Sequence, residues 1–331
     1  MKIAINGFGR IGRSVFRIAF ERGIQIAAIN DLHGAEDAMY LLKYDSVYGN
    51  FKGKVEAKGD ELIVNGKKIK ILSEMNPEKL PWRKLGVDIV VESTGAFRKI
   101  EDAKKHLNAG AKKVLVSAPG KGEMLTIVPG VNEKWIKKSD NVISVASCTT
   151  NCLAPVAKVL NDNFKIKKAM MTTVHAYTSS QNLVDGNLDK KRRGRAAAIN
   201  IVPTTSGATD AVCLTIPELK GKLTGLALRV PVASGSIVDL VVELEKNTSV
   251  EEINKAFKKA AEKEMKGIIE YNDDEIVSSD IIGNSHSAIF DAPLTQKIGS
   301  NLYKVLAWYD NEYGYSSRMV DVIEMMQKFP R

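Results

Sequence analysis

The stretch KIAINGFGRIG, residues 2–12, decides the fold of the N-terminal half. It opens with a short apolar run typical of a β-strand, and three glycines follow at the spacing Gly-x-Gly-x-x-Gly. Apolar side chains then recur at helical spacing until Arg22-Gly23, and residues 24–29 predict a second strand. In a strand–turn–helix unit these glycines permit a tight turn, close backbone approach to a pyrophosphate, and close helix–strand contact. The stretch therefore predicts the first βαβ unit of a dinucleotide-binding domain.

Asp31 strengthens this interpretation, since a glycine motif alone is also common in ordinary turns. It follows the second strand, nineteen residues after Gly12. A carboxylate there accepts a hydrogen bond from a ribose 2′-hydroxyl and repels a 2′-phosphate. The pattern thus favours NAD over NADP.

The rest of the chain shows two kinds of strand pattern. Short β-branched runs at 88–91, 113–116 and 142–145 alternate with helical segments, which indicates a parallel sheet covered on both faces. Between them, residues 53–71 alternate around Asn65-Gly66 and predict an antiparallel insertion. After about residue 147, longer alternating strands predict a mixed, largely antiparallel sheet. We therefore expect an α/β protein: a Rossmann-type doubly wound parallel sheet over 1–147, and a second α+β catalytic domain over 148–312.

Composition excludes some classes of protein and leaves others open. Of 331 residues, 48 are Lys or Arg and 39 are Asp or Glu, so the formal net charge is +9. That excess suits nucleic acid, anionic lipid or a small anionic substrate. No run approaches the roughly 18 apolar residues of a membrane span, and the N-terminus turns polar too early for a signal peptide. Three cysteines are too few for a disulfide framework, and the cysteines and four histidines lack zinc-finger spacing, so we expect no metal site. We therefore expect a cytoplasmic protein.

Cys148 is the candidate nucleophile. The run SCTTNC, residues 147–152, ends a strand and precedes an apolar helix pattern, and a helix N-terminus favours thiolate over thiol. Cys152 and Cys213 lie in apolar runs and are interpreted as buried hydrophobic residues. His175 ends the predicted strand 167–174 and is the candidate base, although a lone histidine at a strand end is more often structural.

The other three histidines have weaker claims to a catalytic role. His33 follows the ribose-binding acid, His106 is expected on a surface helix, and His286 is expected in a polar loop.

Residues 146–155, ASCTTNCLAP, resemble the active-site signature of the phosphorylating glyceraldehyde-3-phosphate dehydrogenase family. The resemblance extends over essentially the whole chain. Its further motifs lie at residues 5–13, 92–95, 174–178, 193–197, 228–231 and 308–316.

The resemblance implies a covalent mechanism. Cys148 would add to the aldehyde of glyceraldehyde 3-phosphate, and His175 would hold the thiolate as an ion pair and then act as base while hydride leaves for NAD. The resulting thioester would be captured by inorganic phosphate as 1,3-bisphosphoglycerate, a step of glycolysis or gluconeogenesis.

The resemblance also implies the binding residues. Thr178 and Arg229 would hold the substrate phosphate. The attacking phosphate would meet Ser147, Thr149, Arg195, Ser206 and Gly207, whereas the neighbouring Lys190, Lys191 and Arg192 are interpreted as a solvated basic loop. The cofactor would meet Gly7, Phe8, Gly9, Arg10, Ile11, Asp31, Met75, Thr94, Ser117, Asn311 and Tyr315.

The sequence departs from the family pattern at a few positions. Met75 stands where many relatives have Arg or Lys, Ser206 replaces a more usual Thr, and Ser180 stands where some relatives have an acid. Asn187 occupies a position often filled by Pro in NAD-specific members, which leaves use of NADP open.

By the same resemblance, the loop 179–203 would pack between the subunits of a homotetramer, and the final helix, 313–331, would complete the first domain.

Two alternative functions remain. A relative of erythrose-4-phosphate dehydrogenase would release the acid without phosphate, but the phosphate-site residues named above argue against it. An RNA-binding protein would interleave aromatic side chains with its basic strip, and the basic loop 190–195 contains none. The expected partners are therefore a small-molecule substrate and inorganic phosphate, without membrane or nucleic acid.

Overall fold

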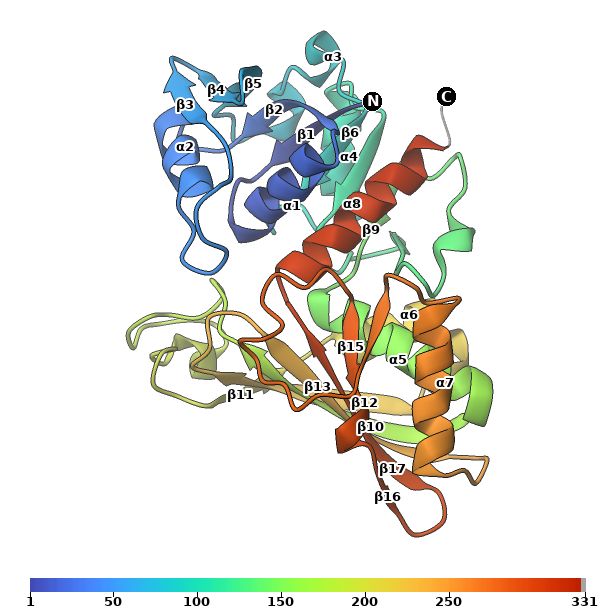
Figure 1. The fold of residues 1–331 in the computed structure, drawn as a ribbon. Helices are drawn as coiled ribbons and strands as arrows, with labels where there is room; N and C mark the ends of the chain where they lie inside the picture. The colour runs from blue at the N-terminus through green and yellow to red at the C-terminus, as the bar shows by residue number, and fades with distance from the viewer. Residues whose placement is uncertain (329–331) are drawn as a thin grey trace. The chain divides into compact units, whose positions relative to one another are not determined.

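The computed structural model describes residues 1–328, and the chain divides into two compact units (Figure 1). The N-terminal unit comprises Met1–Ile127 and Lys134–Ala146, together with the chain from Ser316 onward. The C-terminal unit comprises Val128–Glu133 and Ser147–Tyr315. No helix within residues 1–328 is both long and apolar enough to cross a membrane.

The N-terminal unit is built on a nine-stranded sheet of order β3-β4-β5-β2-β1-β6-β7-β9-β8. Its strands are β1 (Lys2–Asn6), β2 (Gln25–Asn30), β3 (Val55–Lys58), β4 (Glu61–Val64), β5 (Lys67–Leu72), β6 (Ile89–Glu92), β7 (Lys113–Val116), β8 (Leu125–Thr126) and β9 (Val142–Ser144). Its helices are α1 (Arg10–Glu21), α2 (Ala35–Lys43), α3 (Trp82–Leu85), α4 (Ile100–Asn108) and most of α8 (Tyr313–Gln327). Every residue of β6 and β7 is buried, as a parallel sheet covered on both faces requires. This confirms the predicted doubly wound sheet.

The predicted antiparallel insertion is confirmed, and it extends the main sheet. Strands β3, β4 and β5 pair antiparallel, and β5 also pairs in parallel with β2. The turn between β4 and β5 has positive φ at Asn65 (47°) and Gly66 (80°), as the tight Asn-Gly hairpin turn requires.

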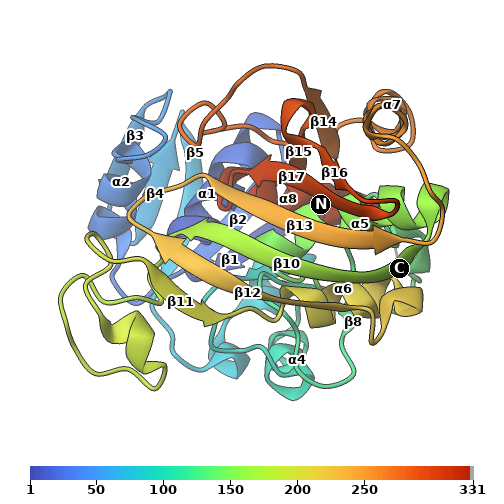
Figure 2. The same cartoon turned by 90° about the horizontal axis from the view of Figure 1, so that it is seen from below.

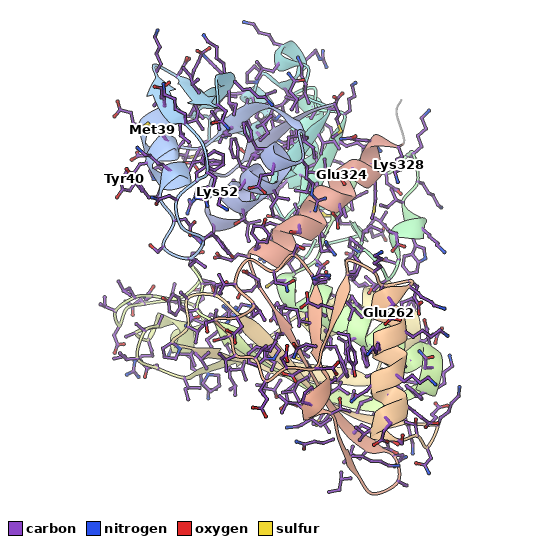
Figure 3. All side chains as sticks on the ribbon, in the orientation of Figure 1. Met39, Tyr40, Lys52, Glu262, Glu324 and Lys328 are labelled. Carbon is purple, nitrogen blue, oxygen red and sulfur yellow. The ribbon has the colours of Figure 1, made fainter. Side chains whose placement is uncertain are left out.

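Ion pairs connect helix α8 to the residue that follows α1. Arg22, just after α1, places its Nη1 2.7 Å from Asp321 and 3.3 Å from Glu324. Figure 3 labels Glu324 on α8. Because these groups are partly exposed, the ion pairs position the helix more than they stabilise it.

The C-terminal unit is an eight-stranded sheet with helices packed on it. The strand order is β11-β12-β10-β13-β17-β15-β14, with β16 paired to β17. The strands are β10 (Ile166–Ala176), β11 (Val202–Thr205), β12 (Leu223–Val230), β13 (Ser236–Leu244), β14 (Ile269–Asn272), β15 (Ala288–Asp291), β16 (Gln296–Ile298) and β17 (Leu302–Tyr309). The helices are α5 (Cys148–Phe164), α6 (Ala208–Thr215) and α7 (Val250–Glu262).

This second sheet is mixed and largely antiparallel, as predicted. Only the pairs β10–β12 and β14–β15 are parallel. Buried and partly exposed residues alternate along β13, so one face of the sheet packs inward. Figure 2 shows α5 and α6 behind this sheet, and both helices contact its strands.

Candidate functional site

A cavity of about 350 Å³ opens in the N-terminal unit where β1, β2 and β6 end. We call it the N-terminal cavity. The predicted residues on its wall are Gly7, Gly9, Asp31, Met75 and Thr94. The rest of the wall is formed by residues that were not among the predicted cofactor residues: Asn6, Asn30, Leu32, His33, Glu74, Ser93, Ala96 and Phe97. A crevice at the carboxyl ends of parallel strands is where open α/β sheets bind their ligands.

The glycines of the motif have distinct environments. Gly7 has φ 92°, and a Cβ there would lie 2.7 Å from the Thr94 amide nitrogen. A Cβ on Gly9 would meet nothing within 4 Å, so that backbone faces open space. Gly9 also caps α1 without a side-chain hydrogen bond, and the first turn of α1 holds no acid. The residues thus fit a bound pyrophosphate, which would meet the amides of a helix N-terminus.

Asp31 is held as a charged acceptor. Its Oδ2 accepts from the Phe8 amide at 2.8 Å, and its Oδ1 accepts from the His33 amide at 3.2 Å. Burial opposes the charged form, but the Phe8 amide and His33 outweigh it and lower the pKa of Asp31 below its ordinary value. The carboxylate therefore suits a ribose hydroxyl donor.

The other predicted cofactor residues do not line this cavity. Arg10 Nη1 is 2.5 Å from Asp45 Oδ2, and Ser117 follows β7 with its amide donating to Glu92 O at 2.9 Å. Asn311 and Tyr315 belong to the C-terminal unit. The Asn311 Oδ1 accepts from the Gly235 amide at 3.1 Å and from Ser236 Oγ at 2.9 Å, so the side-chain amide has a fixed orientation.

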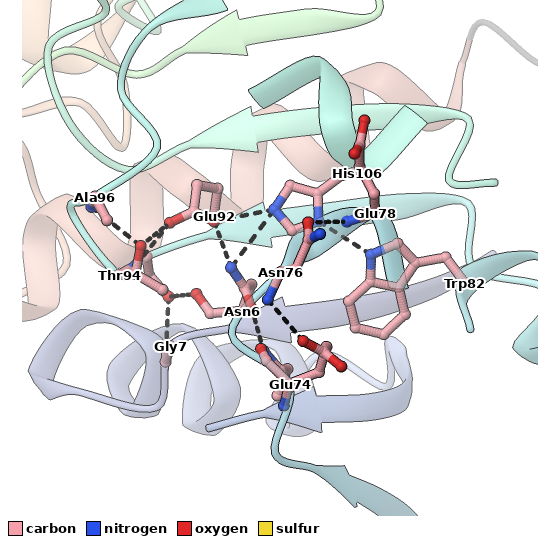
Figure 4. A network of polar contacts seen from close by, with 12 residues as sticks. Asn6, Gly7, Glu74, Asn76, Glu78, Trp82, Glu92, Thr94, Ala96 and His106 are labelled. Atoms are coloured by element: carbon pink, nitrogen blue, oxygen red, sulfur yellow. Dashed lines mark hydrogen bonds and ion pairs between the residues drawn. The ribbon is translucent and has the colours of Figure 1, made fainter. Parts of the chain in front are cut away.

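His106 corrects an expectation. It lies on α4 as predicted, but it is fully buried rather than on the surface. Figure 4 shows it between Trp82 and Glu92. Trp82 Nε1 donates to His106 Nδ1 at 3.0 Å, and His106 Nε2 lies 3.0 Å from Glu92 Oε2. Helical spacing explains the burial, because position 106 falls three residues after Ala103, which is buried on the same helix.

The hydrogen bonds assign the protons of this network. An indole N–H can only donate, so His106 Nδ1 accepts and the proton of the neutral ring is on Nε2, toward Glu92. Glu92 also accepts from Asn6 Nδ2 at 2.6 Å and from the amide and hydroxyl of Thr94. Since Asn6 and Thr94 line the N-terminal cavity, the buried network fixes two parts of its wall.

In the C-terminal unit, the structure brings Cys148 and His175 together. Cys148 is the first residue of α5, and the Ser147 side chain caps that helix by accepting from the Thr150 amide at 3.1 Å. His175 lies near the end of β10, and its Nε2 is 3.4 Å from Cys148 Sγ. The His175 Nδ1 must donate to the Ala176 carbonyl, 2.7 Å away, so Nε2 faces the sulfur.

Burial and a nearby cation control the protonation of this pair. Burial raises the pKa of the Cys148 thiol, whereas Arg229 acts to lower it. Burial, followed by the charge of Arg229, lowers the pKa of His175 to about 3. At rest the surroundings therefore favour a neutral thiol and a neutral imidazole that can accept its proton.

Tyr309 supports the pair and was missed from the sequence. Its hydroxyl lies 2.9 Å from Thr149 Oγ1 and 2.8 Å from Thr173 Oγ1. Its ring meets the His175 ring edge-on, with centroids 5.8 Å apart. Burial raises the pKa of Tyr309 well above its ordinary value, so the phenol stays protonated. The sequence motif 308–316 contains Tyr309, but it did not show that the hydroxyl meets Thr149 and Thr173.

Two hydroxyls link two arginines beside the nucleophile. Arg229 Nη1 donates to Thr178 Oγ1 at 3.0 Å, Thr178 Oγ1 lies 2.9 Å from Ser180 Oγ, and Arg193 Nη1 donates to Ser180 Oγ at 3.2 Å. Burial and the charge of Arg229 lower the pKa of Arg193. The two guanidiniums thus form a cationic pair suited to phosphate.

The structure places Arg193, rather than Arg195, in this cluster. The Arg195 side chain is 63% exposed and pairs with Asp185 at 3.0 Å. Arg193 also donates to Thr204 Oγ1 at 2.9 Å, on β11. Ser206 and Gly207 follow this strand, and Gly207 is the N-cap of α6.

Metal ligands are not gathered anywhere in residues 1–328: no group of three or more His, Cys, Asp or Glu side chains there could hold a metal ion.

Known proteins match this chain over nearly its whole length. Residues 1–100 match the model of the glyceraldehyde 3-phosphate dehydrogenase NAD binding domain, and residues 147–311 match that of the C-terminal domain. The glyceraldehyde-3-phosphate dehydrogenase of Thermotoga maritima is 56% identical over 330 residues, 99% of each chain. That of Geobacillus stearothermophilus is 55% identical over 324 residues, 97% of each chain, and that of Borreliella burgdorferi is 53% identical over 335 residues, 99% of this chain and 100% of the relative. The chain therefore belongs to the glyceraldehyde-3-phosphate dehydrogenase family.

Proposed function

We propose that the protein oxidises glyceraldehyde 3-phosphate with NAD⁺ and inorganic phosphate to 1,3-bisphosphoglycerate through a thioester on Cys148. The observation that carries the proposal is the 3.4 Å approach of His175 Nε2 to a cysteine at the start of a capped helix. Family membership supports the substrate, because the relatives are named for it. When bound, NAD⁺ supplies the hydride acceptor.

His175 acts as the base in this proposal. Its Nε2 accepts the thiol proton as Cys148 Sγ adds to the aldehyde carbon, and the amides at the start of α5 together with Arg229 stabilise the thiolate. After proton transfer the Nδ1–H still donates to the Ala176 carbonyl, so the ring does not rotate during the reaction. Oxidation then leaves the acyl group on Cys148 as a thioester, which retains its acyl-transfer potential.

Phosphate recognition is assigned to the arginine pair. Thr178 and Arg229 would hold the substrate phosphate, and Arg193, Ser206 and Gly207 would hold the attacking phosphate, with Ser147 and Thr149 near the nucleophile. The hydroxyl chain from Arg229 to Arg193 supports this assignment. Arg195 becomes a weaker candidate because Asp185 occupies its guanidinium.

Assembly as a homotetramer is also proposed. The loop 179–203 exposes large apolar side chains: Leu183 is 76% exposed, Val184 72%, Ile199 80% and Ile201 68%. Clustered exposed apolar residues mark protein–protein interfaces. Sedimentation equilibrium should report a tetramer at micromolar concentration, and a monomer would contradict the proposal.

The remaining proposals concern domain limits and location. The cofactor domain would span 1–147 with 313–331, and the catalytic domain 148–312. The three cysteines are free, and a protein that works through a thiol needs a reducing compartment, which supports a cytoplasmic location.

Trapping the intermediate tests the proposed chemistry. With NAD⁺ and glyceraldehyde 3-phosphate but no phosphate, mass spectrometry should find the substrate's acyl group on Cys148, and added phosphate should remove it. Cys213→Ser should acylate normally and Cys148→Ser should not. Turnover without acylation of Cys148 would refute the mechanism.

A further inference from the structure

His33 stands beside the carboxylate on which cofactor recognition rests. It lies between β2 and α2, and its Nδ1 is 2.9 Å from Asp31 Oδ1. Its backbone amide reaches the same oxygen at 3.2 Å. The imidazole side chain is 79% exposed, so solvent protons and ligands reach it freely.

The charge of the N-terminal cavity depends on this side chain. Its wall, as the described residues form it, carries two carboxylates, Asp31 and Glu74, and neither lysine nor arginine. Asp37, in the first turn of α2, adds a third negative charge near His33. Of the residues described on the wall, His33 alone can become cationic near neutral pH.

We propose that His33 determines how strongly the protein discriminates against NADP⁺: neutral His33 leaves Asp31 to repel the 2′-phosphate, and protonated His33 neutralises that carboxylate and admits it. This rests on the proposed use of a dinucleotide at this cavity. The hydrogen bond to Asp31, together with its charge, raises the pKa of His33 above its ordinary value.

The size of the effect follows from the exposure of the ring. One unit charge about 4 Å away in water changes a binding constant by about fivefold. A 2′-phosphate carries between one and two negative charges at these pH values, so we expect a change of about 5- to 25-fold. NAD⁺ lacks that phosphate, and its affinity should change less.

Calorimetric binding of NAD⁺ and NADP⁺ to the full chain, at about pH 6 and about pH 8.5, tests the proposal. Three proteins suffice: wild type, His33→Asn, which stays neutral, and His33→Lys, which stays charged. In wild type the ratio of the two dissociation constants (NADP⁺ over NAD⁺) should fall at low pH about 5- to 25-fold more than in His33→Asn. The His33→Asn series also corrects for protonation of the 2′-phosphate itself. In His33→Lys the ratio should be low at both pH values.

The outcomes separate this proposal from the function on which it rests. If the ratio of dissociation constants depends on pH identically in wild type and His33→Asn, His33 does not have the proposed role. The same conclusion follows if neither wild type nor His33→Lys binds NADP⁺ at about pH 6 or about pH 8.5. In either case normal NAD⁺ binding leaves the proposed function intact. Failure of all three proteins to bind NAD⁺ would refute both.

Discussion

His175 is a single residue prepared for proton transfer by its surroundings. The Ala176 carbonyl fixes its Nδ1 proton, and burial keeps the ring neutral by lowering its pKa to about 3. The same shift has a consequence for folding. In the unfolded chain a histidine titrates at about pH 6.5, so between these pH values the unfolded state binds more protons than the folded state.

Stability should therefore depend on pH through His175. Its favourable contribution is complete above about pH 6.5 and is lost as the pH falls toward 3, with a slope of at most about 1.4 kcal/mol per pH unit. We predict that urea unfolding of wild type weakens more steeply between about pH 6 and pH 4.5 than unfolding of His175→Asn. All other titrating groups are common to both proteins, so equal slopes would show that His175 is not held neutral.

The two arginines at 193 and 195 give a second test at this scale. Arg193→Ala should raise the KM for inorganic phosphate at least tenfold, because charge-assisted hydrogen bonds of about 1.5–3 kcal/mol are lost. Arg195→Ala serves as the matched control and should change this KM less than about threefold, since an exposed ion pair contributes little. Steady-state rates at varied phosphate concentration measure both. A larger increase in this KM for Arg195→Ala than for Arg193→Ala would instead assign the phosphate site to Arg195.

At the scale of elements, the glycine turn between β1 and α1 combines structural and binding roles. In Gly7→Ala the alanine would have a strained positive φ, and its methyl group would clash with the Thr94 backbone. We therefore expect this substitution to destabilise the N-terminal unit by several kcal/mol. Gly9→Ala meets open space and should fold normally, yet bind NAD⁺ at least tenfold more weakly because the methyl group occupies the ligand's place. Thermal unfolding and NAD⁺ titration separate the two effects. Normal NAD⁺ affinity in Gly9→Ala would show that the cofactor does not approach this turn.

The buried network between α3, β6 and α4 predicts a specific cost. Trp82→Phe preserves most of the packing but leaves the Nδ1 of buried His106 without its donor, which should cost about 1–3 kcal/mol of unfolding free energy. Trp135→Phe, at a partly exposed position, is the control and should change stability by less than about 0.5 kcal/mol. Equal denaturation midpoints in urea for the two variants would argue against the hydrogen bond.

Elements and motifs were predictable from the sequence to different degrees. Hydrophobic periodicity identified both sheets, and the order of strand, glycines, helix and acid located Asp31, because these signals are local. The partners of His106 were not predictable, since Trp82 and Glu92 approach it only through tertiary packing. Nor were the contacts of Arg193 with Ser180 and Thr204 predictable, because the loop 179–203 has no periodicity to show which side chain turns inward. The role of Tyr309 was missed because it depends on tertiary contacts with hydroxyls from α5 and β10.

At the scale of the whole molecule, the net charge of +9 suited the function without indicating it. Arg193 and Arg229 are partly or largely buried beside the nucleophile, whereas Lys167 and Lys168 pair with Glu243 at the surface. The proposed chemistry thus draws on a few arginines held by neutral hydroxyls and carbonyls. The remaining excess of basic residues has no assigned ligand.

In the proposed reaction, the aldehyde is oxidised with NAD⁺, and phosphate then releases the acyl group from Cys148. The most direct test follows NADH absorbance in a rapid-mixing experiment with NAD⁺ and glyceraldehyde 3-phosphate, with and without inorganic phosphate. Without phosphate we expect a burst of no more than one NADH per subunit and then negligible turnover, whereas with phosphate we expect continuous turnover. Sustained NADH formation at the same rate in the absence of phosphate would contradict the proposed reaction.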